Sequence, residues 1–181
     1  MINNKLIGLV TLALVLIVGA MPAFAADTDS STQAVQVTVG PTVAIQAFWA
    51  NGADNNTINL GTVAADNVQV PYPGGATGEQ VRTYSNVMID LYTRIAGNFT
   101  NGTNTLDANN FLFTGNVTGQ TAFTAQYQKV FDDWAKAPKG GYNSAPINLA
   151  LTVPFGTDPG DYSTTVYFSA VRHNAVAPVT P

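Results

Sequence analysis

Side chains that could carry acid–base or nucleophilic chemistry are few in this chain. His173 is the only histidine, and cysteine is absent, whereas tetrahedral zinc sites and activated nucleophiles draw on several such residues. Asp132 and Asp133 are adjacent, and on the helix expected there neighbouring side chains diverge around the axis, so they would not flank one substrate. Glu79 lies alone in a glycine-rich stretch. We therefore predict no enzyme, no catalytic residue, no metal site and no cofactor.

Two aromatic residues are candidate glycan contacts. Trp49 stands next to Ala50 and Asn51, and Tyr72 lies in a loop rich in proline and glycine, and sugars are often held by an aromatic face beside an amide. The chain also contains four Asn-x-Thr acceptor sequences for N-glycosylation, all in expected turns or loops. Their asparagines are Asn55, Asn98, Asn101 and Asn116.

The N-terminal residues have the pattern of a secretory signal peptide. Lys5 is followed by an apolar run to about Ala20, then by Pro22 and the small residues Ala23 and Ala25. The run is shorter than the roughly 20 residues that a membrane-spanning helix needs. We predict cleavage after Ala25, a secreted or cell-surface location and no stable membrane span in the mature protein.

Composition excludes one class of partner. The formal net charge is −4 with only 7 Lys+Arg, so no basic patch is available to follow a nucleic-acid backbone. Charged residues make up 10% of the chain, against about 25% in typical globular proteins. With no cysteine for disulfides, an exported chain of this kind depends on hydrophobic packing.

Alternating hydrophobicity predicts β-strands along most of the chain. The expected strands are Val35–Val39, Val43–Trp49, Ile58–Val63, Val68–Val70, a central strand over Val81–Arg94, Phe111–Phe113, and a closing hairpin formed by Ile147–Phe155 and Tyr162–Val171. Between them the apolar residues Phe123, Tyr127, Val130, Phe131 and Trp134 recur at helical spacing, which predicts one amphipathic helix ending before Pro138.

These elements predict a mainly β fold, a two-sheet antiparallel β-sandwich with one inserted amphipathic helix. The expected organisation is a signal peptide at 1–25, a flexible tail with a possible donor strand at 26–40, the sandwich at 41–173 and a C-terminal tail at 174–181.

The closing segment and the Ile58–Val63 segment carry a resemblance. The pattern Val-Pro-x-Gly-Thr-x-Pro-Gly-x-Tyr from Val153 to Tyr162, between two alternating strands, resembles secreted prokaryotic surface sandwiches. The layout is similar to WxL-type wall-associated modules, to the TasA/camelysin group of biofilm-fibre proteins and to archaeal surface-filament subunits. The chain has no Trp-x-Leu sequence, having Trp49-Ala50-Asn51 and Trp134-Ala135-Lys136 instead, so peptidoglycan binding does not carry over.

The fibre-group resemblance implies self-association by donor-strand complementation, in which a terminal strand of one subunit completes the sheet of the next. Val35, Val37 and Val39 would form this assembly strand, and Gly40-Pro41 would separate it from the domain. The alternative is that the strand pairs within its own sheet. We therefore predict a secreted structural subunit of a surface filament, biofilm matrix or surface layer. The alternative function is an extracellular carbohydrate-binding or adhesin module that contacts glycans or other surface proteins.

Overall fold

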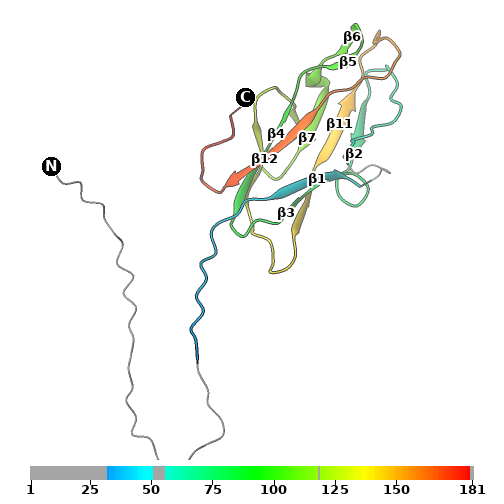
Figure 1. The fold of residues 1–181 in the computed structure, drawn as a ribbon. Coiled ribbons are helices and arrows are strands. Elements are labelled where there is room, and N and C mark those ends of the chain that lie inside the picture. The colour runs from blue at the N-terminus through cyan, green and yellow to red at the C-terminus, as the bar shows by residue number, and fades with distance from the viewer. Residues whose placement is uncertain (1–31, 51–55, 118, 180–181) are drawn as a thin grey trace, which may run out of the picture. The chain divides into compact units, whose positions relative to one another are not determined.

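The computed structural model describes residues 32–50, 56–117 and 119–179, and these residues are mainly β (Figure 1). The expected signal peptide therefore lies outside the described residues. The strands are β1 (Ile45–Trp49), β2 (Gln69–Tyr72), β3 (Glu79–Thr83), β4 (Ile89–Ile95), β5 (Phe99–Asn101), β6 (Asn104–Leu106), β7 (Phe111–Thr114), β8 (Thr121–Ala122), β9 (Gln128–Trp134), β10 (Asn143–Pro146), β11 (Asn148–Thr152) and β12 (Val166–Arg172), and η1 (Ala108–Asn110) is a single 3-10 turn.

The strands form four antiparallel sheets. Their orders are β1-β3-β10, β2-β11-β7-β8, β12-β4-β9 and β5-β6. The first two sheets are joined because β10 and β11 follow each other directly, and Ile147 between them donates its N–H to the Glu79 carbonyl at 3.0 Å. The third sheet has β4 at its centre, and Figure 1 shows β12 running alongside it.

One hydrophobic core unites these sheets. Its buried members come from every sheet and include Val81 of β3, Leu91 of β4, Phe99 of β5, Phe113 of β7 and Leu149 of β11. Rings stack within it, with Phe111 and Phe123 4.8 Å apart between centroids. Close packing of this kind can stabilise a domain without disulfides.

The chain divides into two units, residues 1–38 and 39–181. In the first, the described residues 32–38 form no strand, and the Val35 and Val37 side chains are 92% and 85% exposed. In the second, Val39 is also exposed and strand structure begins at Ile45. The described residues contain no helix with the length and apolar character needed to span a membrane.

The predicted amphipathic helix is wrong. Phe123 and Tyr127 lie in the connection between β8 and β9, Val130, Phe131 and Trp134 lie in β9, and the described chain contains no α-helix. A β-bulge in β9 explains the error: Ile89 and Leu91, two residues apart on β4, pair with Trp134 and Phe131, three residues apart on β9. Asp133 within the bulge has φ +51°. The extra residue stretches an alternating pattern into a helix-like spacing.

The predicted closing hairpin is also wrong. β11 and β12 form where alternation predicts them, but they lie in different sheets. β11 already has β2 on one edge and β7 on the other, and β12 pairs with β4. Both edges of β11 are therefore used, and β12 cannot join it.

Two further strand predictions differ from the structure. The expected strand Val81–Arg94 is divided into β3 and β4, with residues 84–88 turning the chain from one sheet to another. The expected strand Ile58–Val63 does not form a ladder. The four-sheet arrangement of the described residues leaves the predicted two-sheet sandwich unconfirmed, while the mainly β class is confirmed.

Candidate functional site

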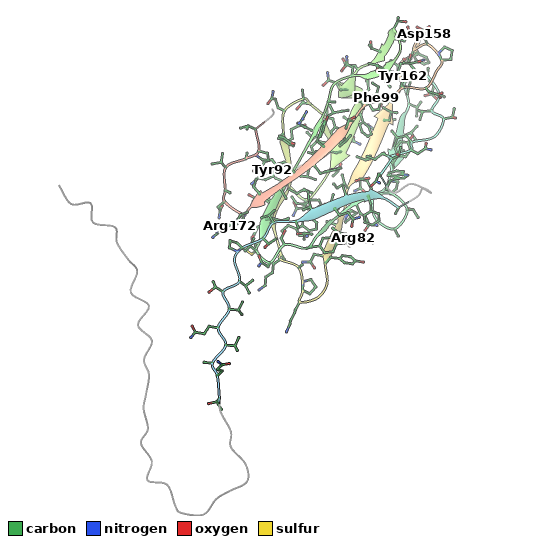
Figure 2. The ribbon with its side chains drawn as sticks, viewed as in Figure 1. Arg82, Tyr92, Phe99, Asp158, Tyr162 and Arg172 are labelled. Carbon is green, nitrogen blue, oxygen red and sulfur yellow. The ribbon has the colours of Figure 1, made fainter. Side chains whose placement is uncertain are left out.

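A groove of about 850 Å³ with an apolar floor and a partly polar rim lies in the described part of the second unit. Apolar side chains from five elements or their ends form its floor. These are Phe99 of β5, Leu106 of β6, Phe111 of β7, Leu151 and Val153 at the end of β11, and Val166 of β12. Figure 2 shows Phe99, Tyr162 and Asp158 close to the end of the domain that carries β5 and β6 in Figure 1. We name this hollow the acceptor groove.

One wall of the acceptor groove is an extended segment, residues 56–66. Its apolar side chains Ile58, Leu60 and Val63 are half-buried against the core. From 58 to 65 it makes no backbone–backbone hydrogen bond to another described segment. The Tyr72 hydroxyl donates to the Leu60 carbonyl at 2.9 Å, and Gly61, at φ +69°, donates its N–H to Asn59 Oδ1. Residues 58–65 of this wall are therefore held mainly by side chains.

The other wall, residues 157–166, is tied to the domain by its backbone. Ser163 exchanges two hydrogen bonds with Thr100, at 3.0 and 3.1 Å. The Thr164 hydroxyl donates to the Gly97 carbonyl at 3.0 Å, and the Tyr162 hydroxyl donates to the Asp158 carbonyl at 2.9 Å. The bonds from Ser163 and Thr164 therefore attach this wall to the chain around residues 97–100.

An unpaired strand edge meets the acceptor groove at Val166. β12 pairs with β4 over its whole length, from Val166 to Arg172, and with no other described strand. Its core-facing side chains Val166, Phe168 and Ala170 are only partly buried against the core. The edge therefore offers free N–H and C=O groups beside apolar side chains that are not fully covered.

The chain next to the predicted assembly strand is clamped to the domain by side chains. Asn86 Oδ1 accepts the Thr42 N–H at 2.7 Å, and Asn86 Nδ2 donates to the Gly40 carbonyl at 2.9 Å. The Ala44 N–H donates to the Ser85 hydroxyl at 2.9 Å. The chain is therefore attached to the domain from residue 40 onward, directly after Val39.

The predicted glycan contacts do not share an exposed surface. Trp49 is 3% exposed in β1, and Tyr72 is half-buried in β2 of another sheet. Burial raises the pKa of the Tyr72 phenol. Tyr72 also borders a small hollow of about 140 Å³ with Gln120 and Asn148. An exposed pair of aromatic rings beside one groove, the feature expected of a sugar site, is not formed by these two residues.

The predicted glycosylation sites differ in accessibility. Asn98 and Asn116 are exposed, and each side-chain oxygen accepts a backbone N–H, from Ala108 and Asp132 respectively. Asn101 is half-buried, and its amide packs directly against Gly160. Asn55 lies outside the described residues.

A buried carboxyl is the main electrostatic feature of β3. Glu79 is 1% exposed, and its Oε2 has no hydrogen-bond partner. It pairs in register with Trp49, whose Nε1 is also buried without a partner. Burial raises the pKa of Glu79 to about 7, because the charged form loses its hydration.

Sequence reasoning missed the acceptor groove. Its floor combines residues from β5, β6, β7, β11 and β12, and only the folded topology brings these together. The only sequence pattern that pointed to the groove was the alternation of Ile58 and Leu60. It predicts an apolar face for this segment, but not that the segment forms no backbone hydrogen bonds with a neighbouring strand of the described chain.

The fold and the groove define a mainly β domain with an unpaired strand edge beside an apolar hollow. No protein-family model matches the chain, and no curated protein matches it.

Proposed function

We propose that this protein is a secreted structural subunit of a cell-surface filament, assembled by β-strand addition. In this proposal residues 35–39, the donor strand, leave one copy and enter the acceptor groove of the next copy along the β12 edge. The observation that carries the proposal is the unpaired β12 edge beside an apolar groove. The layers of the predicted sandwich would then be the β12-β4-β9 sheet and the two sheets joined through β10 and β11.

The donor strand has the side-chain pattern that such a groove requires. Strand residues alternate between faces, so Val35, Val37 and Val39 would all face the floor formed by Phe111, Leu151 and their neighbours. Gln36 and Thr38 would face solvent. Backbone hydrogen bonds to β12 supply affinity in this mode of recognition, and the side chains in the groove supply specificity.

Exposure of the donor strand supports the same conclusion. Val35, Val37 and Val39 are 92%, 85% and 78% exposed, a costly state for three valines. Each buried valine side chain contributes about 1.5–3 kcal/mol relative to an exposed one. A head-to-tail contact between two different surfaces of the same chain yields a filament when its repetition does not close into a ring.

The experiment compares the chain starting at Ala26 with a chain starting at Pro41, by size-exclusion chromatography and negative-stain electron microscopy. We expect filaments from the first and monomers from the second. Circular dichroism checks that the shortened chain is folded. Filaments from both chains, or folded monomers from both, would refute assembly by the donor strand.

A further inference from the structure

We propose that Asp90, Asp132 and His173 form a binding site for a divalent transition-metal ion of the Zn²⁺ type. The site lies on the β12-β4-β9 sheet, outside the acceptor groove, and the inference does not depend on filament assembly. Sequence reasoning predicted no metal site because the three ligands are far apart in the chain and only one is a histidine.

The three ligand atoms converge from three strands. Asp90 lies on the central strand β4, Asp132 lies in the bulge of β9, and His173 follows β12. His173 Nδ1 is 2.8 Å from Asp90 Oδ1 and 3.9 Å from Asp132 Oδ1, and all three atoms lie within 4.8 Å of one another. Ligands about 2.0–2.2 Å from a tetrahedral ion are themselves roughly 3.3–3.6 Å apart, so small side-chain shifts suffice. Figure 2 labels Tyr92, which lies two residues after Asp90 on β4, and Arg172, which directly precedes His173.

Each ligand is positioned by a backbone or outer contact. Asp90 is 2% exposed, and its Oδ1 accepts the Asp133 N–H at 3.1 Å. The Asp132 N–H donates to Asn116 Oδ1 at 3.3 Å. The Asp133 carboxylate lies 3.9 Å from His173 Nε2. A carboxylate next to the non-coordinating nitrogen orients metal-binding histidines in many proteins.

The charges around the site favour a cation. Three carboxylates, those of Asp90, Asp132 and Asp133, surround the imidazole. Without a metal, the Lys129 ammonium lies between two of them, 3.1 Å from Asp90 Oδ2 and 2.7 Å from Asp132 Oδ1. Lys129 is therefore a built-in competitor for the ion. Its side chain is 32% exposed, so it can withdraw into solvent when a divalent ion binds the same oxygens.

The ligand set selects the class of ion. Imidazole suits Zn²⁺, Ni²⁺ and Cu²⁺, while Mg²⁺ and Ca²⁺ prefer oxygen ligands alone. A bound ion would join β4, β9 and the end of β12 at one point. Because the unfolded chain lacks this arrangement, binding would stabilise the folded state.

The test is thermal unfolding of the chain from Ala26, with and without Zn²⁺, together with calorimetric titration of Zn²⁺ and of Mg²⁺. We expect Zn²⁺ to raise the melting temperature and Mg²⁺ to leave it unchanged. Asp132→Asn and His173→Gln should each weaken Zn²⁺ binding at least tenfold. Asp107→Asn, which removes an exposed carboxylate outside both sites and keeps a side-chain oxygen that can accept the Asn109 N–H, is the matched control and should bind as the parent does.

Lys129→Met gives the sharper readout. Removal of the competing ammonium should lower the stability of the metal-free protein but tighten Zn²⁺ binding several-fold, an outcome that a general loss of structure would not produce. Absence of Zn²⁺ binding by the parent chain would overturn the proposal. So would binding that survives both His173→Gln and Asp132→Asn, or binding that Lys129→Met abolishes.

Discussion

The Tyr72 hydroxyl donates a hydrogen bond of 2.9 Å to the carbonyl of Leu60. This bond joins the end of β2 to residues 56–66, the wall of the acceptor groove that is not part of a sheet. From 58 to 65 this wall has no backbone–backbone hydrogen bond to another described segment. A single phenol therefore contributes much of the polar attachment of residues 58–65 to the rest of the domain.

Tyr72→Phe should destabilise the protein by about 1 kcal/mol, the typical net value of one such hydrogen bond. Urea unfolding measures the change. Tyr84→Phe is the control, because the Tyr84 hydroxyl donates to Gln46 on an exposed surface at 3.2 Å, and its loss should change stability by less than about 0.5 kcal/mol. Equal losses in the two variants would contradict the assigned role of Tyr72.

Glu79 should make the stability depend on pH. Its pKa is raised by burial from 4.5 to about 7 in the folded state. Between these two values the unfolded chain has released the proton while the folded chain still holds it, so the free energy of unfolding falls as pH rises from about 4.5 to 7 and then levels off. The full change is on the order of 3 kcal/mol.

Glu79→Gln tests this dependence because the amide does not titrate. We measure the free energy of unfolding of both proteins by urea titration at several pH values. That of Glu79→Gln should fall less than that of the parent between about pH 4.5 and 7, and above pH 7 it should be the larger of the two. Parallel pH profiles for the two proteins would rule out a raised pKa at Glu79.

The Asp133 bulge gives a prediction about backbone conformation. Asp133 has φ +51°, a region that costs an L-residue roughly 1–2 kcal/mol and glycine little. Asp133→Gly should match or exceed the stability of Asp133→Ala, and Asp133→Val should be less stable than Asp133→Gly by about 1–2 kcal/mol. All three variants lack the carboxylate, so their differences report the backbone. Equal unfolding midpoints would mean that the bulge relaxes.

Particular residues show what sequence patterns could predict. Strict alternation located strands near β1, β4, β11 and β12, because side chains such as Leu91 and Leu149 must face the core. In β9 the alternation rule led to a wrong helix prediction, because the residue inserted at the Asp133 bulge places Phe131 and Trp134 at helical spacing. Alternation also cannot predict strand partners, because it indicates which face of a strand is buried but not which strand lies at its edge.

The candidate sites depend even more on long-range pairing. The donor strand was identified from alternation and a resemblance, and it remains a prediction. The acceptor groove arises where β12 pairs with β4 and leaves its other edge unpaired within the described chain. The proposed metal ligands Asp90 and His173 are brought together by that same pairing.

The two faces of the donor strand should respond differently to charge. Val37→Asp would place a carboxylate against the apolar floor and should abolish filaments, because an unpaired buried charge is strongly unfavourable. Thr38→Asp adds the same charge to the solvent face and should leave filaments in place. Negative-stain microscopy and sedimentation measure both. Equal effects of the two substitutions would exclude a strand that inserts one face into the groove.

Complementation between two defective subunits tests the central claim most directly. Val37→Asp impairs the donor strand and leaves the groove intact, whereas Val166→Arg fills the groove and leaves the donor strand intact, with Val166→Ile as the control for folding. Each defective protein alone should be monomeric, and an equimolar mixture should form a 1:1 heterodimer by size exclusion with light scattering. A mixture that stays monomeric, although both proteins are folded and the parent forms filaments, would contradict donor-strand insertion into this groove.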